Sequence, residues 1–134
     1  MKKYPVRCPV TSYLHVMDGH WKPILVWDLR KGALRFSELL EAVPDISTRV
    51  LAEQLKELEE DDIIIRIAYS ETPPRVEYHL SRYGETLLSA LALLRQWGLR
   101  HLKQNVDLLH PDSEWKAVNG KLKAGNKRKR EAGV

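Results

Sequence analysis

The sequence predicts a mainly α-helical domain with one small β-hairpin, an α+β arrangement. Three observations predict it. Apolar residues recur at helical spacing through most of the first hundred residues. Residues 63–80 instead carry β-branched and alternating side chains on either side of a Pro-Pro turn. The 134-residue length fits one domain, and 43% hydrophobic with 30% charged residues is typical of a globular chain.

Two helices are expected before residue 32. The first is opened by Cys8-Pro9, because proline suits the first helical position, and it ends at Asp18-Gly19. The second runs from Lys22 to Arg30 and ends at Lys31-Gly32, a cation followed by a glycine.

Two further helices meet at the turn Pro44-Asp45. One spans Arg35 to Val43. The other starts with Ser47 as its expected N-cap. Its apolar seam lies at positions i, i+4 and i+7, which are Leu51, Leu55 and Leu58.

A hairpin and one long helix complete the pattern. Residues 63–69 and 75–80 are the two expected strands, and Ser81 caps a helix from about Arg82 to Lys103. That helix is apolar around so much of its circumference that it needs a second subunit as well as its own domain. The expected dimer interface combines this helix with the first one, through Val10, Leu14, Leu87, Leu91, Leu94 and Trp97.

This order of elements is that of a winged helix–turn–helix. We expect residues 1–110 to form one DNA-binding and dimerisation domain and residues 111–134 to form a basic, flexible tail. Residues 1–110 hold 15 basic and 15 acidic residues, whereas the tail holds seven basic and three acidic ones. The net charge of +4 therefore lies in the tail. Such a tail favours nonspecific attraction to nucleic acid, or it is simply a solvated end.

The chain resembles the HxlR-type family, a branch of the MarR-like winged-helix transcription regulators. The resemblance rests on short motifs that run in family order over residues 7–98: Cys8-Pro9-Val10, Gly19-His20-Trp21-Lys22, Arg35-Phe36-Ser37-Glu38-Leu39, Ile46-Ser47-Thr48-Arg49-Val50-Leu51, Gln54-Leu55-Lys56-Glu57-Leu58-Glu59, Pro73-Pro74-Arg75-Val76-Glu77-Tyr78, Leu80-Ser81-Arg82-Tyr83-Gly84 and Trp97-Gly98. It implies a dimeric, sequence-specific DNA-binding regulator without enzymatic activity.

The chain departs from the family pattern at three positions. His20 stands where the family usually has lysine or glycine, which removes a phosphate contact. Asp45 and Asp62 stand where glycine is common. Aspartate tolerates positive φ better than most residues, so both turns are expected to form.

The second helix of the motif enters the major groove. Ser47 and Thr48 stand at its leading end, and Arg49 is the best candidate for a bidentate guanine contact. Thr48 and Ala52 suit a thymine methyl group, and Lys56 meets phosphate. Glu53 repels phosphate unless it accepts from a cytosine or orients Arg49. The alternative is that these residues are only the solvated face of an amphipathic helix.

Three further residues belong to the predicted DNA surface. Arg75 follows the Pro-Pro tip of the wing and suits a narrow minor groove, or else it pairs with Glu71 or Glu77. Arg35 and Ser37 begin a helix whose free N–H groups bind phosphate, or they serve only as caps. Lys22 is a weaker candidate of the same type.

Cys8 is the single cysteine, so no internal disulfide forms. It precedes a helix whose dipole and first N–H groups stabilise a thiolate. Some members of the resembled family sense oxidants or electrophiles with a cysteine at this position, including through a disulfide between subunits. The resemblance implies a redox-sensor role for Cys8, and the alternative is an inert residue packed at the dimer interface.

No enzyme, cofactor or metal site is expected. The sequence has no serine-nucleophile motif, no phosphate-binding glycine loop and no paired acid–base signature. The histidines (His15, His20, His79, His101 and His110) are not spaced as a metal motif. No signal sequence or membrane span is recognised, so a cytoplasmic location is expected.

The expected function is a homodimeric repressor that binds an inverted-repeat operator in double-stranded DNA and responds to oxidants through Cys8. No small-molecule effector is assigned. The alternative is a winged-helix protein-interaction module without a specific DNA site.

Overall fold

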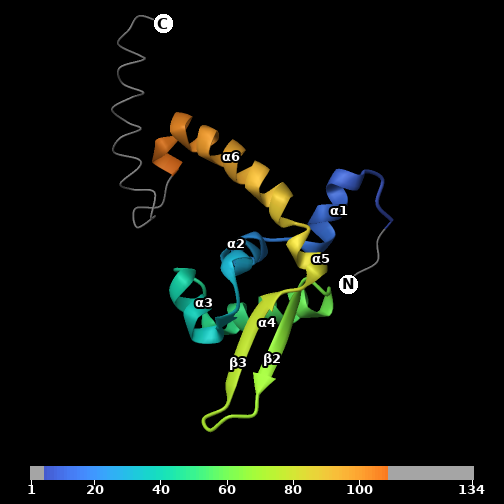
Figure 1. Ribbon diagram of the computed structural model, residues 1–134. Coiled ribbons are helices and arrows are strands. Elements are labelled where there is room, and N and C mark those ends of the chain that lie inside the picture. The colour runs from blue at the N-terminus through green and yellow to red at the C-terminus, as the bar shows by residue number, and fades with distance from the viewer. Residues whose placement is uncertain (1–4, 109–134) are drawn as a thin grey trace, which may run out of the picture. The chain divides into compact units, whose positions relative to one another are not determined.

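The structure is a computed structural model that describes residues 5–108 (Figure 1). Its helices are α1 (Pro9–Val16), α2 (Trp21–Asp28), α3 (Phe36–Ala42), α4 (Thr48–Glu60), α5 (Arg82–Glu85) and α6 (Leu88–Gln104), with 3₁₀ turns at Leu29–Lys31 and Val106–Leu108. Its strands are β1 (Leu34–Arg35), β2 (Ile64–Tyr69) and β3 (Arg75–Leu80). The chain divides into two compact units within α6, between Leu91 and Ala92. The predicted winged helix–turn–helix is confirmed in the first unit, while the tail predicted for residues 111–134 lies outside the described residues.

The three strands form an antiparallel sheet in the order β1-β3-β2. In the β2–β3 hairpin Ile64 pairs with Leu80 at the base, and Tyr69 pairs with Arg75 near the tip. Figure 1 shows this hairpin extending away from the helices, which is the wing that the sequence predicted.

The short strand β1 was not predicted, since Arg35 was expected to begin a helix. Leu34 and Arg35 instead pair with Tyr78 and Glu77 of β3, and the helix starts one residue later, at Phe36. A two-residue strand is too short to show an alternating pattern.

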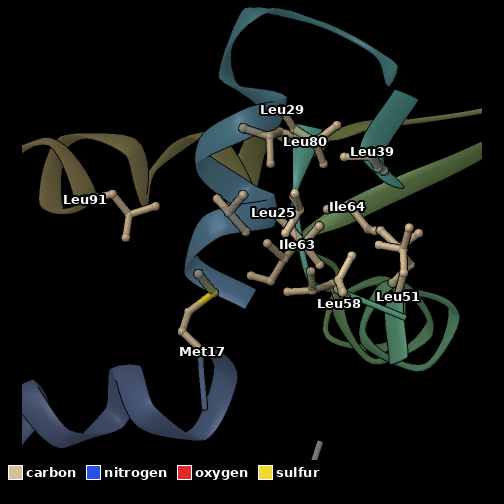
Figure 2. Packing of buried hydrophobic residues seen from close by; sticks show 14 residues of the cluster. Met17, Leu25, Leu29, Leu39, Leu51, Leu58, Ile63, Ile64, Leu80 and Leu91 are labelled. Carbon is tan, nitrogen blue, oxygen red and sulfur yellow. The ribbon is translucent and has the colours of Figure 1, made fainter. Parts of the chain in front are cut away.

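The hydrophobic core lies between α2, α4 and the start of β2. The predicted seam of α4 is confirmed, because Leu51, Leu55 and Leu58 are all fully buried. Figure 2 shows Leu58 and Leu25 of α2 meeting around Ile63. The recognition helix of the motif is thus held by one apolar face, and its opposite face is left to solvent.

Two helices begin at the predicted serine caps, and two turns are formed by aspartates in left-handed conformations, as predicted. The Ser47 hydroxyl accepts the Val50 N–H at 3.1 Å, and the Ser81 hydroxyl accepts the Gly84 N–H at 2.8 Å. Asp45 and Asp62 adopt φ values of 73° and 59°, so aspartate fills both positions where glycine was expected in the family.

The single helix predicted from about Arg82 to Lys103 was wrong, because the chain breaks at Thr86 and Leu87. The helix α5 packs against Ile63, the residue before β2: a Cβ added to Gly84 would lie 2.0 Å from the Ile63 carbonyl oxygen. The Ser81 hydroxyl also donates to the Ile63 carbonyl at 3.1 Å. This docking sets the direction of α5, and the helix restarts at Leu88.

Candidate DNA-binding surface

The exposed face of α4 carries the residues predicted to meet DNA. Opposite the buried leucines, Thr48, Arg49, Ala52, Glu53 and Lys56 are all exposed. The Arg49 guanidinium lies 2.9 Å from a Glu53 carboxylate oxygen, one turn along the helix. This contact matches the orienting role that was one of two predicted for Glu53.

Ser47 begins this helix with its hydroxyl used as an acceptor. A serine hydroxyl has one donor and two acceptor positions, so the cap leaves its O–H available to donate to a phosphate oxygen. The exposed Lys56 stands two turns beyond Arg49 on the same face. The α4 surface therefore offers hydrogen-bond donors at its start and a cation further along.

The start of α3 shows the capping that was the alternative explanation for Arg35, while no cap bond involves Ser37 in the described residues. The Arg35 backbone N–H donates to a Glu38 carboxylate oxygen at 2.9 Å. The side chains of Arg35 and Ser37 are exposed. Capping occupies the backbone donor of Arg35 and leaves its guanidinium facing solvent.

The wing arginine Arg75 is held against the tip of its own hairpin. Its guanidinium lies 4.1 Å from the centre of the Tyr69 ring. Its nitrogens lie 3.1 Å from a Glu71 carboxylate and 3.6 Å from that of Glu77. The ion pair stated as the alternative is therefore what the structure shows, and a minor-groove contact requires Arg75 to leave these partners.

A second wing cation was missed by the sequence reasoning. Arg66 of β2 is exposed and sits opposite Tyr78 of β3. Its place between Ile65 and Ile67 in an alternating strand was the available signal.

Lys22 is not a surface cation, although the sequence predicted it as a weaker candidate for binding phosphate. It is 3% exposed and pairs with Asp18 at 2.7 Å and with Glu57 at 2.6 Å. Burial lowers the pKa of Lys22, but the hydrogen bonds and charges of the two carboxylates outweigh this effect and raise it above its ordinary 10.5. Lys22 therefore stays charged within the protein, and its buried ammonium is bound by two carboxylates.

Most of the predicted dimer-interface residues are exposed in the single chain. On α1, Val10 and Leu14 are 78% and 56% exposed, and on α6, Leu94 and Trp97 are 53% and 59% exposed. Leu93 adds an exposed apolar side chain that was not predicted, whereas Leu91 is buried in the subunit's own core and Leu87 packs against that core.

Cys8 is exposed and stands immediately before α1. Its carbonyl accepts the backbone N–H and the hydroxyl of Thr11, at 3.0 Å and 2.8 Å. These bonds involve only the backbone of Cys8, which leaves its thiol open to solvent.

Within residues 5–108, no helix is both long and apolar enough to cross a membrane. The same residues contain no group of three histidine, cysteine, aspartate or glutamate side chains placed to hold a metal ion.

The chain is similar to known transcription regulators along most of its length. The HTH-type transcriptional regulator YtcD of Bacillus subtilis (strain 168) is 39% identical over 123 residues, which cover 92% of this chain and 98% of that protein. A crystal structure of YtcD matches with a TM-score of 0.67 and 42% identity, covering 71% of this chain and 97% of that one.

A redox regulator is also among the similar structures. HypR in its oxidised form matches with a TM-score of 0.66 and 41% identity, over 69% of this chain and 96% of that one. In its reduced form it matches with a TM-score of 0.69 and 36% identity, over 76% of this chain and all of that one.

These likenesses favour a DNA-binding regulator over a winged-helix module that binds only proteins. The family model described as HxlR-like helix-turn-helix matches residues 16–106, which include α2, the whole helix–turn–helix and the wing. The chain therefore belongs to the HxlR-like helix-turn-helix family of transcription regulators.

Proposed function

We propose that this regulator acts in the cytoplasm as a homodimeric repressor that binds an inverted-repeat operator. The observation that carries the proposal is the exposed face of α4, where Thr48, Arg49 and Lys56 stand opposite a fully buried leucine seam. A helix held in this way presents its outer side chains to the major groove without disturbing the core.

The exposed apolar side chains support a dimer. Val10 and Leu14 on α1, and Leu93, Leu94 and Trp97 on α6, are large and more than half exposed. Large exposed apolar side chains gathered on a helix are typical of protein–protein interfaces. A symmetric dimer would place two α4 helices about 34–36 Å apart, one turn of DNA, so that each reads one half-site.

We further propose that oxidation of Cys8 controls this spacing. HypR, the similar redox regulator, has been solved in oxidised and reduced forms. Cys8 is the single cysteine of this chain, so an intersubunit disulfide joins the two Cys8 residues of a dimer. Two thiols give up two protons and two electrons to a quinone, which becomes a hydroquinone, and the new bond requires the two Cα atoms to approach to about 4.4–6.8 Å.

Fluorescence anisotropy tests the DNA-binding proposal. The probe is the DNA upstream of the protein's own gene, with a scrambled duplex as competitor, at about 150 mM salt. Specific binding about a thousandfold or more above nonspecific binding is expected. If the protein does not bind this duplex more tightly than the scrambled one, a selection from genomic fragments follows. Failure to enrich any fragment would contradict the proposal.

Non-reducing electrophoresis after mild quinone treatment tests the switch. A covalent dimer is expected in the wild type and not in Cys8→Ser, with a loss of operator affinity in the wild type alone. A disulfide that leaves operator affinity unchanged would rule out the switch while leaving the DNA-binding function intact.

A further inference from the structure

The buried ammonium of Lys22 joins two parts of the winged helix. Asp18 lies in the connection between α1 and α2, and Glu57 lies in the third turn of α4. The Lys22 nitrogen contacts a carboxylate oxygen of each, at 2.7 Å and 2.6 Å. Within residues 5–108, Lys22 is the one charged residue in the buried class.

The two carboxylates reach this ammonium from the surface. The Asp18 and Glu57 side chains are 67% and 51% exposed, while that of Lys22 is 4% exposed. Replacing a buried ion pair of this kind by apolar side chains is often neutral for stability, because the replacement also removes the cost of burying the ammonium. The contribution of the ion pair is geometric, since a charged hydrogen bond requires each carboxylate to stay at one place.

The position of Glu57 connects this geometry to DNA reading. Glu57 lies eight residues beyond Arg49, about 12 Å along the axis of the same rigid helix. The fully buried Leu51 holds the first turn of α4 in the core, and Lys22 holds the helix near its end. Two points of attachment fix the direction in which the exposed face of α4 points.

Lys22 also neutralises a charge on the recognition helix. Thr48–Glu60 contains two basic residues and four glutamates. Glu53 is paired with Arg49 and Glu57 with Lys22. Without Lys22, the Glu57 carboxylate would be a further uncompensated negative charge on the helix that approaches phosphate.

We propose that Lys22 is a positioning residue which, by binding Asp18 and Glu57 together, fixes the recognition helix relative to the segment that follows α1. The inference rests on the proposed DNA-binding function and adds how the fold sets the direction of α4. It predicts that Lys22 controls which half-site spacing the protein accepts, although it does not touch DNA.

The test compares two glutamate variants of the same helix. Glu57→Gln removes the negative charge from the contact to α4, where only a neutral amide oxygen remains as acceptor, and it leaves Lys22 paired with Asp18, so the buried ammonium keeps a charged partner. Glu60→Gln makes the same change of charge one turn further on, at an exposed side chain. The difference between the two variants therefore reports the contact with Lys22 and not the charge of α4.

A third variant separates positioning from stability. Lys22→Met combined with Glu57→Gln removes the ammonium together with the carboxylate that it would leave unpaired on α4. An apolar replacement of this kind is expected to keep the thermal midpoint of unfolding close to that of the wild type.

The probe is a duplex that the wild-type protein selects from a random pool, together with duplexes whose half-sites are one or two base pairs closer or further apart. We expect Glu57→Gln and the double variant to bind the selected duplex at least about fivefold more weakly than Glu60→Gln, with reduced discrimination between spacings. Hydrogen exchange of the α4 amides should also be faster in both variants than in Glu60→Gln.

The outcomes decide between a positioning and a purely structural role. Unchanged affinity, spacing preference and α4 exchange in Glu57→Gln would overturn the proposal. If the wild type selects no duplex, the DNA-binding function fails instead, and exchange of the α4 amides still shows whether Lys22 fixes the helix.

Discussion

Arg49 and Lys56 share one face of α4 but stand at different distances from its leading end. In a winged helix–turn–helix the first turns of the recognition helix reach base edges, and later turns face phosphate. We predict that Arg49→Ala lowers discrimination at one base pair by about 1–3 kcal/mol. Lys56→Ala should instead weaken binding to all sequences alike and lower the salt slope by about one. Both effects are measured by titrating the selected duplex and its single-base variants over a series of salt concentrations.

Lys31→Ala is the matched control, because Lys31 is an exposed cation outside the predicted DNA surface. Its affinity and salt slope should stay at the wild-type values. An equal loss of affinity for every duplex in Arg49→Ala would show that Arg49 contacts phosphate and does not read a base.

At the scale of the elements, Gly84 decides how α5 meets the sheet. A methyl group on Gly84 would overlap the Ile63 backbone, which is not the movable end of a side chain. We predict that Gly84→Ala destabilises the fold by about 1–3 kcal/mol, even though alanine favours helices. The free energy of unfolding in urea measures this loss.

Glu85→Ala, at the exposed neighbouring residue of α5, is the control for helix propensity. It should leave stability within about 0.5 kcal/mol of the wild type. If Gly84→Ala is as stable as Glu85→Ala, α5 can move off the sheet without cost, and the break before α6 has another cause.

Elements that depend on local patterns were predictable from the sequence. The i, i+4, i+7 leucines of α4, the serine caps and the alternating wing are each set by residues close in sequence. The elements that were predicted wrongly, and the burial of Lys22, involve a partner far along the chain. β1 pairs with Tyr78 and Glu77, α5 is docked onto Ile63, and Lys22 is bound by Glu57. No local period encodes such contacts, so the sequence pattern does not show that Lys22 is buried.

The candidate site was predicted in outline for the same reason. The exposed face of an amphipathic helix follows from its buried seam, which identified Arg49 and Lys56. The state of Arg75 did not follow, since two carboxylates and the Tyr69 ring compete for its guanidinium. Sequence alone ranks such partners poorly because their distances depend on the twist of the wing.

At the scale of the whole molecule, two proton-binding groups predict loss of stability in alkali. Burial raises the pKa of Tyr13 above its ordinary 10.0, and the pKa of Lys22 is above 10.5. Both groups hold a proton more tightly in the folded than in the unfolded chain. Their contribution to stability is therefore complete below about pH 10. It is lost as the pH rises through the pKa values that the two groups have in the folded protein.

The midpoint of urea unfolding should thus be steady from about pH 7 to 9.5 and should fall above pH 10. Tyr13→Phe and the double variant Lys22→Met, Glu57→Gln should each show a shallower fall, because each lacks one of the two groups. If the urea midpoint of both variants falls as steeply above pH 10 as that of the wild type, other residues cause the loss of stability in alkali.

The proposed dimer makes the sharpest prediction for the whole molecule. Because Trp97 is 59% exposed in the single chain, Trp97→Asp should leave the subunit folded while disfavouring burial against a second copy. Sedimentation velocity should then show a monomer. The affinity of the Trp97→Asp protein for the full operator should fall by about 10²–10⁴-fold, toward that for a single half-site, since the two α4 helices no longer belong to one dimer.

Ile65→Asn, at an exposed apolar residue of the wing, should remain a dimer in the same experiment. A Trp97→Asp protein that still sediments as a dimer would require the α1 residues, without α6, to hold the two recognition helices one turn of DNA apart.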